Sequence, residues 1–171
     1  MRLKTLLLGG TLLFFVSLAW AQNGGSGGKV LKGKLDLKTL TSDTAYAWFY
    51  TGVNKYQPND NMLNYIKSNR EKFNVVALIG TWDQQSRVLF PQLYKVMVLA
   101  GSPETQMLIF GADEKLDTGA PVEYKLKRVP TFIILKEGKE LGRISGNVDE
   151  SIEADIAKIL LKADKKEKGD D

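Results

Sequence analysis

The sequence predicts an α/β domain with a mixed sheet of four to five strands and helices on both faces. Residues 75–79 form an uninterrupted apolar, largely β-branched run closed by Gly80, which is typical of a strand buried on both sides. A helical period over residues 84–100 follows, and a crossover helix of this kind joins parallel strands. A short turn at Gly138 joins two later strands, which predicts an antiparallel pair.

The region before this core is expected to contain one strand and two helices. Apolar and polar residues alternate over 31–37, which predicts a half-exposed strand. Ser42 or Asp43 is suited to cap a short helix rich in aromatic residues. Asn59 or Asp60 is suited to cap the next helix, which should run to about residue 73. The apolar face of that helix is expected to comprise Met62, Leu63 and Ile66.

The second half of the chain alternates apolar runs with turns. Residues 106–110, 131–135 and 140–145 are predicted strands, and a polar loop over 111–123 separates the first two. A final helix is expected to open with a capping box formed by Asn147 and Glu150. Its apolar stripe would consist of Ile152, Ile156, Ile159, Leu160 and Ala163.

The N-terminal composition predicts an exported protein. Residues 1–21 combine a basic start, an apolar run and a closing Ala-Trp-Ala, the pattern of a cleaved signal peptide. An uncleaved membrane anchor is the alternative. Residues 22–29 form a Gly/Ser linker, 30–165 the domain, and 166–171 a charged tail. We therefore expect a periplasmic or secreted protein with no membrane association after cleavage.

The composition excludes several classes of function. The chain has no Cys and no His, so it lacks the usual ligands of zinc, copper and haem and the usual nucleophile–base pairs. The net charge is +4, with both signs interspersed, which gives no electrostatic case for nucleic acid. Asp113, Glu114 and Asp117 lack the spacing of a calcium loop and are expected in a solvated loop. No metal or other cofactor is expected.

Three local signatures follow one another at a particular spacing. Trp82 follows the buried strand and precedes a helix start, Pro91 lies within that helix, and residues 128–131 read Arg-Val-Pro-Thr. With this order of elements, residues 43–163 resemble the thioredoxin-like family. They resemble more narrowly its exported bacterial members, whose motif often reads Trp-Cys-x-Asp-Ser-Arg. The resemblance implies a thioredoxin-like fold for the domain and a cis bond before Pro130.

The sequence departs from that family at the positions that carry its chemistry. Asp83 stands where the resemblance places the nucleophilic cysteine, Ser86 stands at the resolving position, and Ala77 replaces a buried aspartate. Disulfide exchange requires a thiolate that forms a mixed disulfide, and a carboxylate cannot replace it. Thiol–disulfide oxidoreductase activity is therefore excluded. Asp83 is expected to act as an ordinary helix N-cap, with a charge that imitates a thiolate as the alternative.

These observations predict a redox-inactive binding, scaffold or chaperone-like module with a protein or peptide partner. An enzyme with non-thiol chemistry and a purely structural subunit are the alternatives. Trp82 could be a binding hot spot or only a cover for the end of the sheet. An aromatic group around Trp48 (Tyr46, Phe49, Tyr50 and Tyr56) is expected in the core rather than at a ligand site. The predicted tip comprises Trp82, Asp83, Gln84, Gln85, Ser86, Arg87, Val129 and Pro130.

Overall fold

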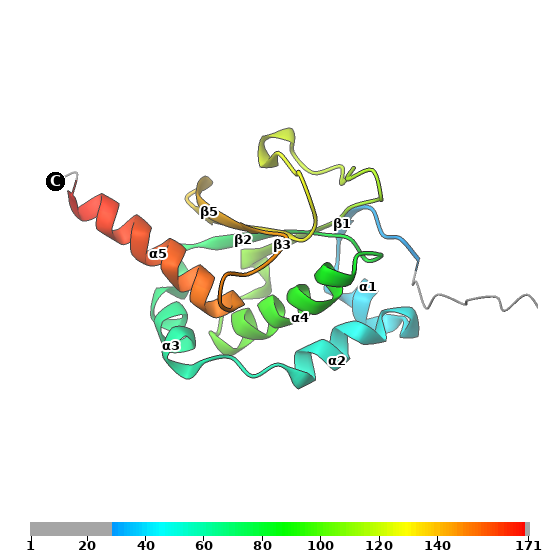
Figure 1. Ribbon diagram of the computed structural model, residues 1–171, viewed down its shortest axis with the longest axis horizontal. Helices are drawn as coiled ribbons and strands as arrows, with labels where there is room; N and C mark the ends of the chain where they lie inside the picture. Colours follow the sequence, from blue (N-terminus) through cyan, green and yellow to red (C-terminus); the bar gives the residue numbers. More distant parts are fainter. Residues whose placement is uncertain (1–28, 170–171) are drawn as a thin grey trace, which may run out of the picture.

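The fold is a five-stranded mixed sheet with five α-helices packed against it, as seen in a computed structural model that describes residues 29–169 (Figure 1). The α/β class and the mixed sheet are therefore confirmed. The predicted signal peptide, all of the linker except its last residue, and residues 170–171 lie outside the described residues. Within residues 29–169, none of the helices has the length and hydropathy needed to span a bilayer.

The sheet has the order β1-β3-β2-β4-β5, which is compatible with a thioredoxin-like fold. The central strand β2 (Asn74–Ile79) runs parallel to β3 (Met107–Gly111) and antiparallel to β4 (Thr131–Lys136). At the two edges, β1 (Gly33–Leu35) pairs with β3 and β5 (Lys139–Ser145) pairs with β4, both antiparallel. The parallel and antiparallel pairings around β2 agree with the prediction.

All five α-helices cover the same face of the sheet (Figure 1). They are α1 (Leu37–Ser42), α2 (Ala47–Lys55), α3 (Asp60–Asn69), α4 (Gln84–Leu99) and α5 (Ile152–Gly169). Alternate residues of β2 point into this helical layer, and the intervening ones point to the opposite face. The main core therefore lies between the sheet and the helices.

The opposite face differs from the expectation of helices on both faces. Residues 112–128 cover it, and the single helical element in that stretch is the short 3-10 helix η4 (Val122–Tyr124). Tyr124 and Leu126 pack there against a small cluster that contains Val76 and Leu78. The covering stretch includes Gly119 and Pro121 and has no helical period, so it lacks the pattern that would form an α-helix.

Three of the predicted helix N-caps are confirmed, and one is wrong. Asp43, Asn59 and Asp83 each accept a backbone N–H from the first turn of the helix that follows, as predicted. The capping box proposed at Asn147 is wrong, because α5 begins at Ile152. The cap there comes from the Ser151 hydroxyl, which accepts the N–H of Ala154 at 3.3 Å.

Three further expectations need correction. Leu37 lies at the start of α1 rather than in a strand, since β1 is limited to three residues. Met62 is exposed, so the buried side of α3 depends mainly on Ile66, with Leu63 partly buried. Helix α5 continues to Gly169, so the expected tail is helical as far as the structure describes it. The Lys136 ammonium, which donates to both carboxylate oxygens of Glu167 at 2.6 and 2.8 Å, holds this end against the sheet.

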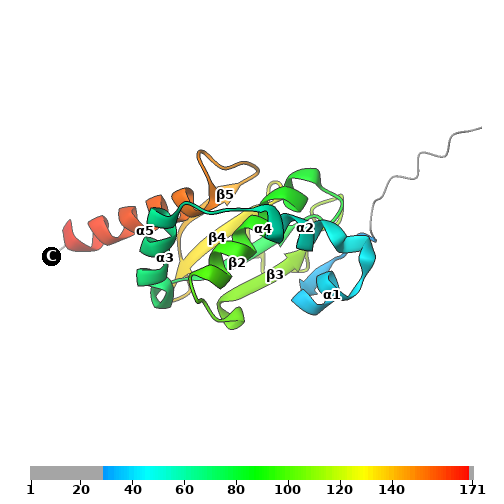
Figure 2. The same ribbon diagram turned by 90° about the horizontal axis from the view of Figure 1, so that it is seen from below.

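Helices α2 and α4 approach each other closely, and this contact positions the candidate site (Figure 2). Phe49 of α2 stacks on Phe90 of α4 with ring centroids 5.5 Å apart, and it also contacts Tyr94. Gly52 faces Pro91 so closely that an added Cβ would lie 2.7 Å from the proline Cβ. The absence of a side chain at Gly52 therefore allows the two helices to meet.

Candidate functional site

The two halves of the predicted tip lie at the same end of two neighbouring inner strands of the sheet, β2 and β4. Strand β2 ends at Ile79 and leads into Trp82, while β4 begins at Thr131 directly after Pro130. Leu78 lies opposite Thr131 in the antiparallel pair. The segment after β2 and the segment before β4 therefore lie at the same end of these strands. The peptide bond between Val129 and Pro130 is cis, as the family resemblance implied.

Asp83 and Ser86 form a closed hydrogen-bond network at the start of α4. The Asp83 carboxylate accepts the Ser86 backbone N–H at 2.6 Å and the Ser86 hydroxyl at 2.7 Å. The Gly80 N–H donates to the same hydroxyl oxygen at 3.1 Å. Asp83 is thus the predicted N-cap. Ser86 is fully buried, so its expected place at an exposed tip is wrong.

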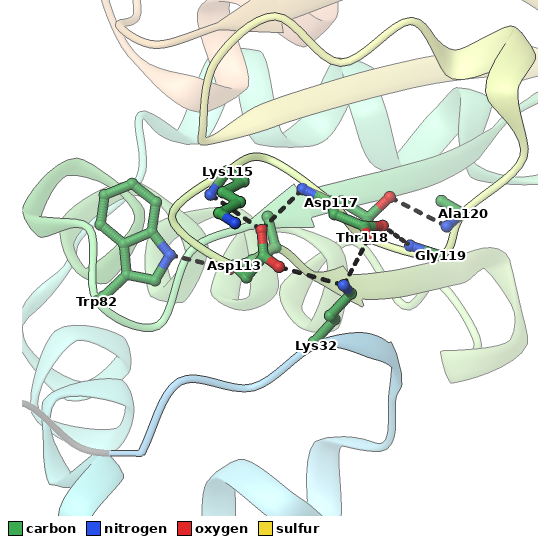
Figure 3. Close-up of polar contacts among 9 residues, drawn as sticks. Lys32, Trp82, Asp113, Lys115, Asp117, Thr118, Gly119 and Ala120 are labelled. Carbon is green, nitrogen blue, oxygen red and sulfur yellow. Dashed lines mark hydrogen bonds and ion pairs between the residues drawn. The ribbon is translucent and has the colours of Figure 1, made fainter.

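Trp82 covers the end of the sheet. Its indole Nε1–H, on the side chain labelled Trp82 in Figure 3, donates to the Ala112 carbonyl at 2.9 Å. Its ring packs over Gly80. The side chain is half-buried. The geometry therefore favours the covering role of the two alternatives, with part of the ring still open to solvent.

The second half of the predicted tip is also buried. Val129 and Pro130 are both buried, with Val129 8% exposed, and the Pro130 carbonyl accepts the N–H of Gly146 at 2.7 Å. The Thr131 hydroxyl donates to the Arg128 carbonyl at 2.8 Å, which fixes the chain on the other side of the dipeptide. Of the predicted tip, the exposed or half-exposed residues are Trp82, Asp83, Gln84, Gln85 and Arg87.

The acidic loop beside Trp82 is held by a lysine. The Lys32 ammonium lies between Asp113 and Asp117 and donates to both carboxylates, at 3.1 Å to Asp113 (Figure 3). The Asp117 N–H and then this ammonium lower the pKa of Asp113 below its ordinary value. Lys32 thus offsets one of the two negative charges of the acidic pair. Within residues 29–169, no three His, Cys, Asp or Glu side chains gather closely enough to hold a metal ion.

A cavity of about 520 Å³ lies beside the predicted tip, between α2 and the N-terminal half of α4. We call it the α2/α4 groove. Gln84 and Arg87 are its only members from the predicted tip, and they come from the first turn of α4. The complete lining is Trp48, Thr51, Gly52, Lys55, Tyr56, Gln84, Arg87, Val88 and Gln92.

The aromatic group that we expected in the core divides between core and groove. Tyr46 and Phe49 are buried, as expected. Tyr50 is half-exposed, and Trp48 and Tyr56 are partly buried and line the groove. The sequence reasoning therefore missed Trp48 and Tyr56 as site residues. The available signal was the spacing of eight residues between Trp48 and Tyr56, next to the buried Phe49. This spacing does not distinguish a residue in the core from a residue that lines a groove.

Hydrogen bonds fix the position of Tyr56 at one end of the groove. Its hydroxyl donates to the Glu153 carboxylate at 2.6 Å, and its carbonyl accepts the Lys95 ammonium at 2.6 Å. Glu153 also accepts the Asn59 N–H at 2.9 Å. Burial raises the pKa of Glu153, but the hydrogen bonds that its carboxylate accepts, with that from the Asn59 N–H first among them, together outweigh burial, so the pKa lies below its ordinary value. Burial and the bond to Glu153 raise the pKa of Tyr56.

Arg87 is fixed at the other end of the groove. Its Nε–H donates to the Thr81 carbonyl at 2.8 Å, which ties the guanidinium to the segment between β2 and α4. The lining as a whole offers two aromatic rings, the apolar Val88, side-chain amides and the cations of Lys55 and Arg87. Such a surface can bind a polar chain with apolar side groups.

Two other cavities have a different character. One of about 490 Å³ lies on the opposite face, beneath residues 116–126, and is lined mostly by the loop itself. One of about 360 Å³ lies between β5 and α5, where Lys158 is already paired with Glu150. The α2/α4 groove is larger than either and has both aromatic and cationic walls.

A scan against models of known protein families finds no match, and no curated protein matches the chain.

Proposed function

We propose that this protein is a redox-inactive binding module whose partner, a protein or peptide, contacts the α2/α4 groove. The observation that carries the proposal is the aromatic and cationic lining of the groove, with Trp48, Tyr56 and Arg87 around a cavity of about 520 Å³. Trp, Tyr and Arg are the residue types that most often dominate the free energy of binding at protein interfaces. Val88 is 41% exposed and adds an apolar contact.

The groove is held in place by contacts that lie beneath it. Phe49 stacks on Phe90, Gly52 fits against Pro91, and Tyr56 is hydrogen-bonded to Glu153. A surface that is already ordered loses less conformational entropy when it binds. This arrangement supports a site formed before the partner arrives.

The proposal also concerns the family and the location of the protein. We propose an exported, thioredoxin-like protein that acts in the periplasm or outside the cell and has lost thiol chemistry. The sheet order and the Trp82 motif support this origin, and the lack of Cys excludes a mixed-disulfide intermediate. Mass spectrometry of the exported protein tests the localisation. A mature chain that begins near Gln22 supports it, and a chain that retains Met1 contradicts it.

A matched pair of variants tests the groove. Val88 and Val98 lie on the same helix and are 41% and 50% exposed, but Val98 does not line the groove. We would immobilise wild type, Val88→Asp and Val98→Asp and compare the proteins that each captures from the cells that produce it. The added charge at Val88 would be desolvated under a bound partner, which costs binding free energy.

The expected result is a partner retained by wild type and Val98→Asp and lost by Val88→Asp. Circular dichroism should show all three proteins folded, since both positions are exposed. A partner captured equally by all three would place the interface elsewhere and would refute the groove as the binding site.

A further inference from the structure

We propose that the α2/α4 groove recognises an acidic segment of its partner, in which an Asp or Glu lies beside a large apolar side chain. This inference rests on the proposed function, and it specifies the chemistry of the ligand. Three observations support it: the charges that line the groove, the internal hydrogen bonds of the adjoining carboxylates, and the apolar surface of the groove.

The charged residues of the groove lining are all cationic. Lys55 lies in the last turn of α2 and is exposed, and Arg87 lies in the first turn of α4. The Lys95 ammonium adds a third positive charge beside the groove, where the Tyr56 carbonyl holds it. No Asp or Glu is among the residues that line this cavity. A groove whose charges have one sign attracts a ligand of the opposite sign.

Two carboxylates adjoin residues of the groove, and both are engaged inside the protein. Glu153 is 2% exposed and accepts from the Tyr56 hydroxyl and the Asn59 N–H. Asp83 accepts from the backbone and hydroxyl of Ser86 at the helix cap. Neither acid forms an ion pair with Lys55 or Arg87 among the contacts of residues 29–169. The hydrogen bonds of Glu153 and Asp83 therefore leave the charges of Lys55 and Arg87 available to a ligand.

Arg87 keeps donors that suit a carboxylate. Its Nε–H is used by the Thr81 carbonyl, and this bond restrains the plane of the guanidinium. The two Nη groups carry the remaining donors of the planar fork, and such a fork matches the two oxygens of a carboxylate. A restrained arginine also loses less side-chain entropy on binding than a mobile one.

An apolar side chain of the ligand has a matching surface in the same groove. Trp48 and Tyr56 present partly buried rings, and Val88 is exposed on the α4 side. An acidic residue next to a Leu, Ile or Phe would place its carboxylate at Arg87 or Lys55 and its apolar neighbour on these rings. The groove thus selects for a combination of charge and apolar contact, and neither alone satisfies it.

Selection from a random library of 12-residue peptides displayed on phage tests this inference. The target is protein purified from cells that express the full chain, and Val88→Asp serves to remove peptides that bind outside the groove. We expect groove-dependent peptides to be enriched in Asp and Glu next to aliphatic or aromatic residues. A selected peptide is then synthesised with its acids intact and with each acid replaced by the matching amide.

The affinities of these two peptides are measured by fluorescence anisotropy. Loss of one charge-assisted hydrogen bond should weaken binding about tenfold, for the amide peptide and for Arg87→Gln or Lys55→Ala. Lys67→Ala is the matched control, because Lys67 is also an exposed lysine in the last turn of its helix, outside the groove. It should leave the affinity unchanged.

Each other outcome overturns the inference. Groove-dependent peptides without acid enrichment, or equal binding of the acidic and amide peptides, would refute the charge preference and leave the groove as a binding site. A selection that yields no groove-dependent peptide would refute recognition of a linear acidic segment. The capture experiment with Val88→Asp and Val98→Asp would still decide the proposed function independently.

Discussion

Replacement of Gly52 by Ala should destabilise the protein through the contact between α2 and α4. The added Cβ would lie 2.7 Å from Cβ and 2.8 Å from Cγ of Pro91. Both distances are far below van der Waals contact, and the proline ring cannot rotate away because it is built into α4. Overpacking of this kind costs about 1–3 kcal/mol. Replacement of Gly by Ala in a helix by itself stabilises the protein by about 0.5–1 kcal/mol.

The two ranges combine to a decrease of about 0–2.5 kcal/mol in the free energy of unfolding, with a central expectation of about 1 kcal/mol, or about 3–4 °C in melting temperature for a domain of this size. Urea unfolding followed by far-UV circular dichroism measures the free energy. Gly169→Ala is the matched control, since Gly169 is also helical and an added Cβ there meets no atom within 4 Å. Its effect should stay within about 0.5 kcal/mol.

A Gly52→Ala protein more stable than wild type would refute the close approach of the two helices. It would also weaken the argument for a preformed groove, because Gly52 lines that groove and packs against the buried Pro91. If the helices separate to admit the methyl group, the groove changes shape. Capture of the partner should then fall together with stability.

Three further predictions concern the polar networks. Glu153→Gln should lower stability at pH 7 by about 1.5–3 kcal/mol. Because the folded-state pKa of Glu153 is lowered, its contribution is present above its unfolded pKa of about 4.3 and is lost as the pH falls through the folded value. Urea unfolding at pH 7 and pH 3 should therefore show a difference between wild type and variant that shrinks in acid, and a constant difference would contradict this role. Ser86→Ala should cost about 1–3 kcal/mol in thermal unfolding because it removes the partner of the Gly80 N–H, and a neutral result would contradict the network. Asp83→Cys should give a thiol with a pKa below the ordinary value of a free cysteine, measured as the pH dependence of alkylation, because it would lie at a helix N-terminus. An ordinary or raised thiol pKa would contradict that placement.

The buried strands could be predicted closely from the sequence because their signal is local. Residues 75–79 and 131–135 are runs of apolar residues that differ from the observed strands by one residue at an end. A strand with both faces covered needs apolar residues at every position, and little else in the chain has that pattern. The parallel pairing of β2 with β3 then follows from the intervening helix α4.

The helix starts and the second face of the sheet were less predictable. Asn147 and Ser151 are both good N-caps, and the sequence alone does not show which one the chain uses. The structure uses Ser151, and the Asp155 carboxylate accepts the N–H of Asp149 just before it. On the opposite face of the sheet, the fold predicted a covering helix, but residues 112–128 lack the periodicity of one. The observed loop agrees with that local pattern.

The division of the aromatic group depends on tertiary packing. Phe49 and Trp48 are neighbours in one helix with similar propensities, and only the position of α4 buries the first and leaves the second at a groove. The same holds for Ser86, whose hydroxyl is suited equally to an exposed helix start and to a buried network. Its burial follows from the Gly80 N–H and the Asp83 carboxylate, which both bond to the Ser86 hydroxyl.

The Asp83–Ser86 network also bears on why the groove, rather than the tip, is the better candidate site. A buried polar network in which each member is hydrogen-bonded adds rigidity and offers few donors to a ligand. Asp83 and Ser86 bond to each other, and the Trp82 indole bonds to the Ala112 carbonyl. The start of α4 is thereby fixed, and it holds Arg87 in the lining of the groove. In this arrangement, Asp83 and Ser86 support the proposed binding surface but do not line it.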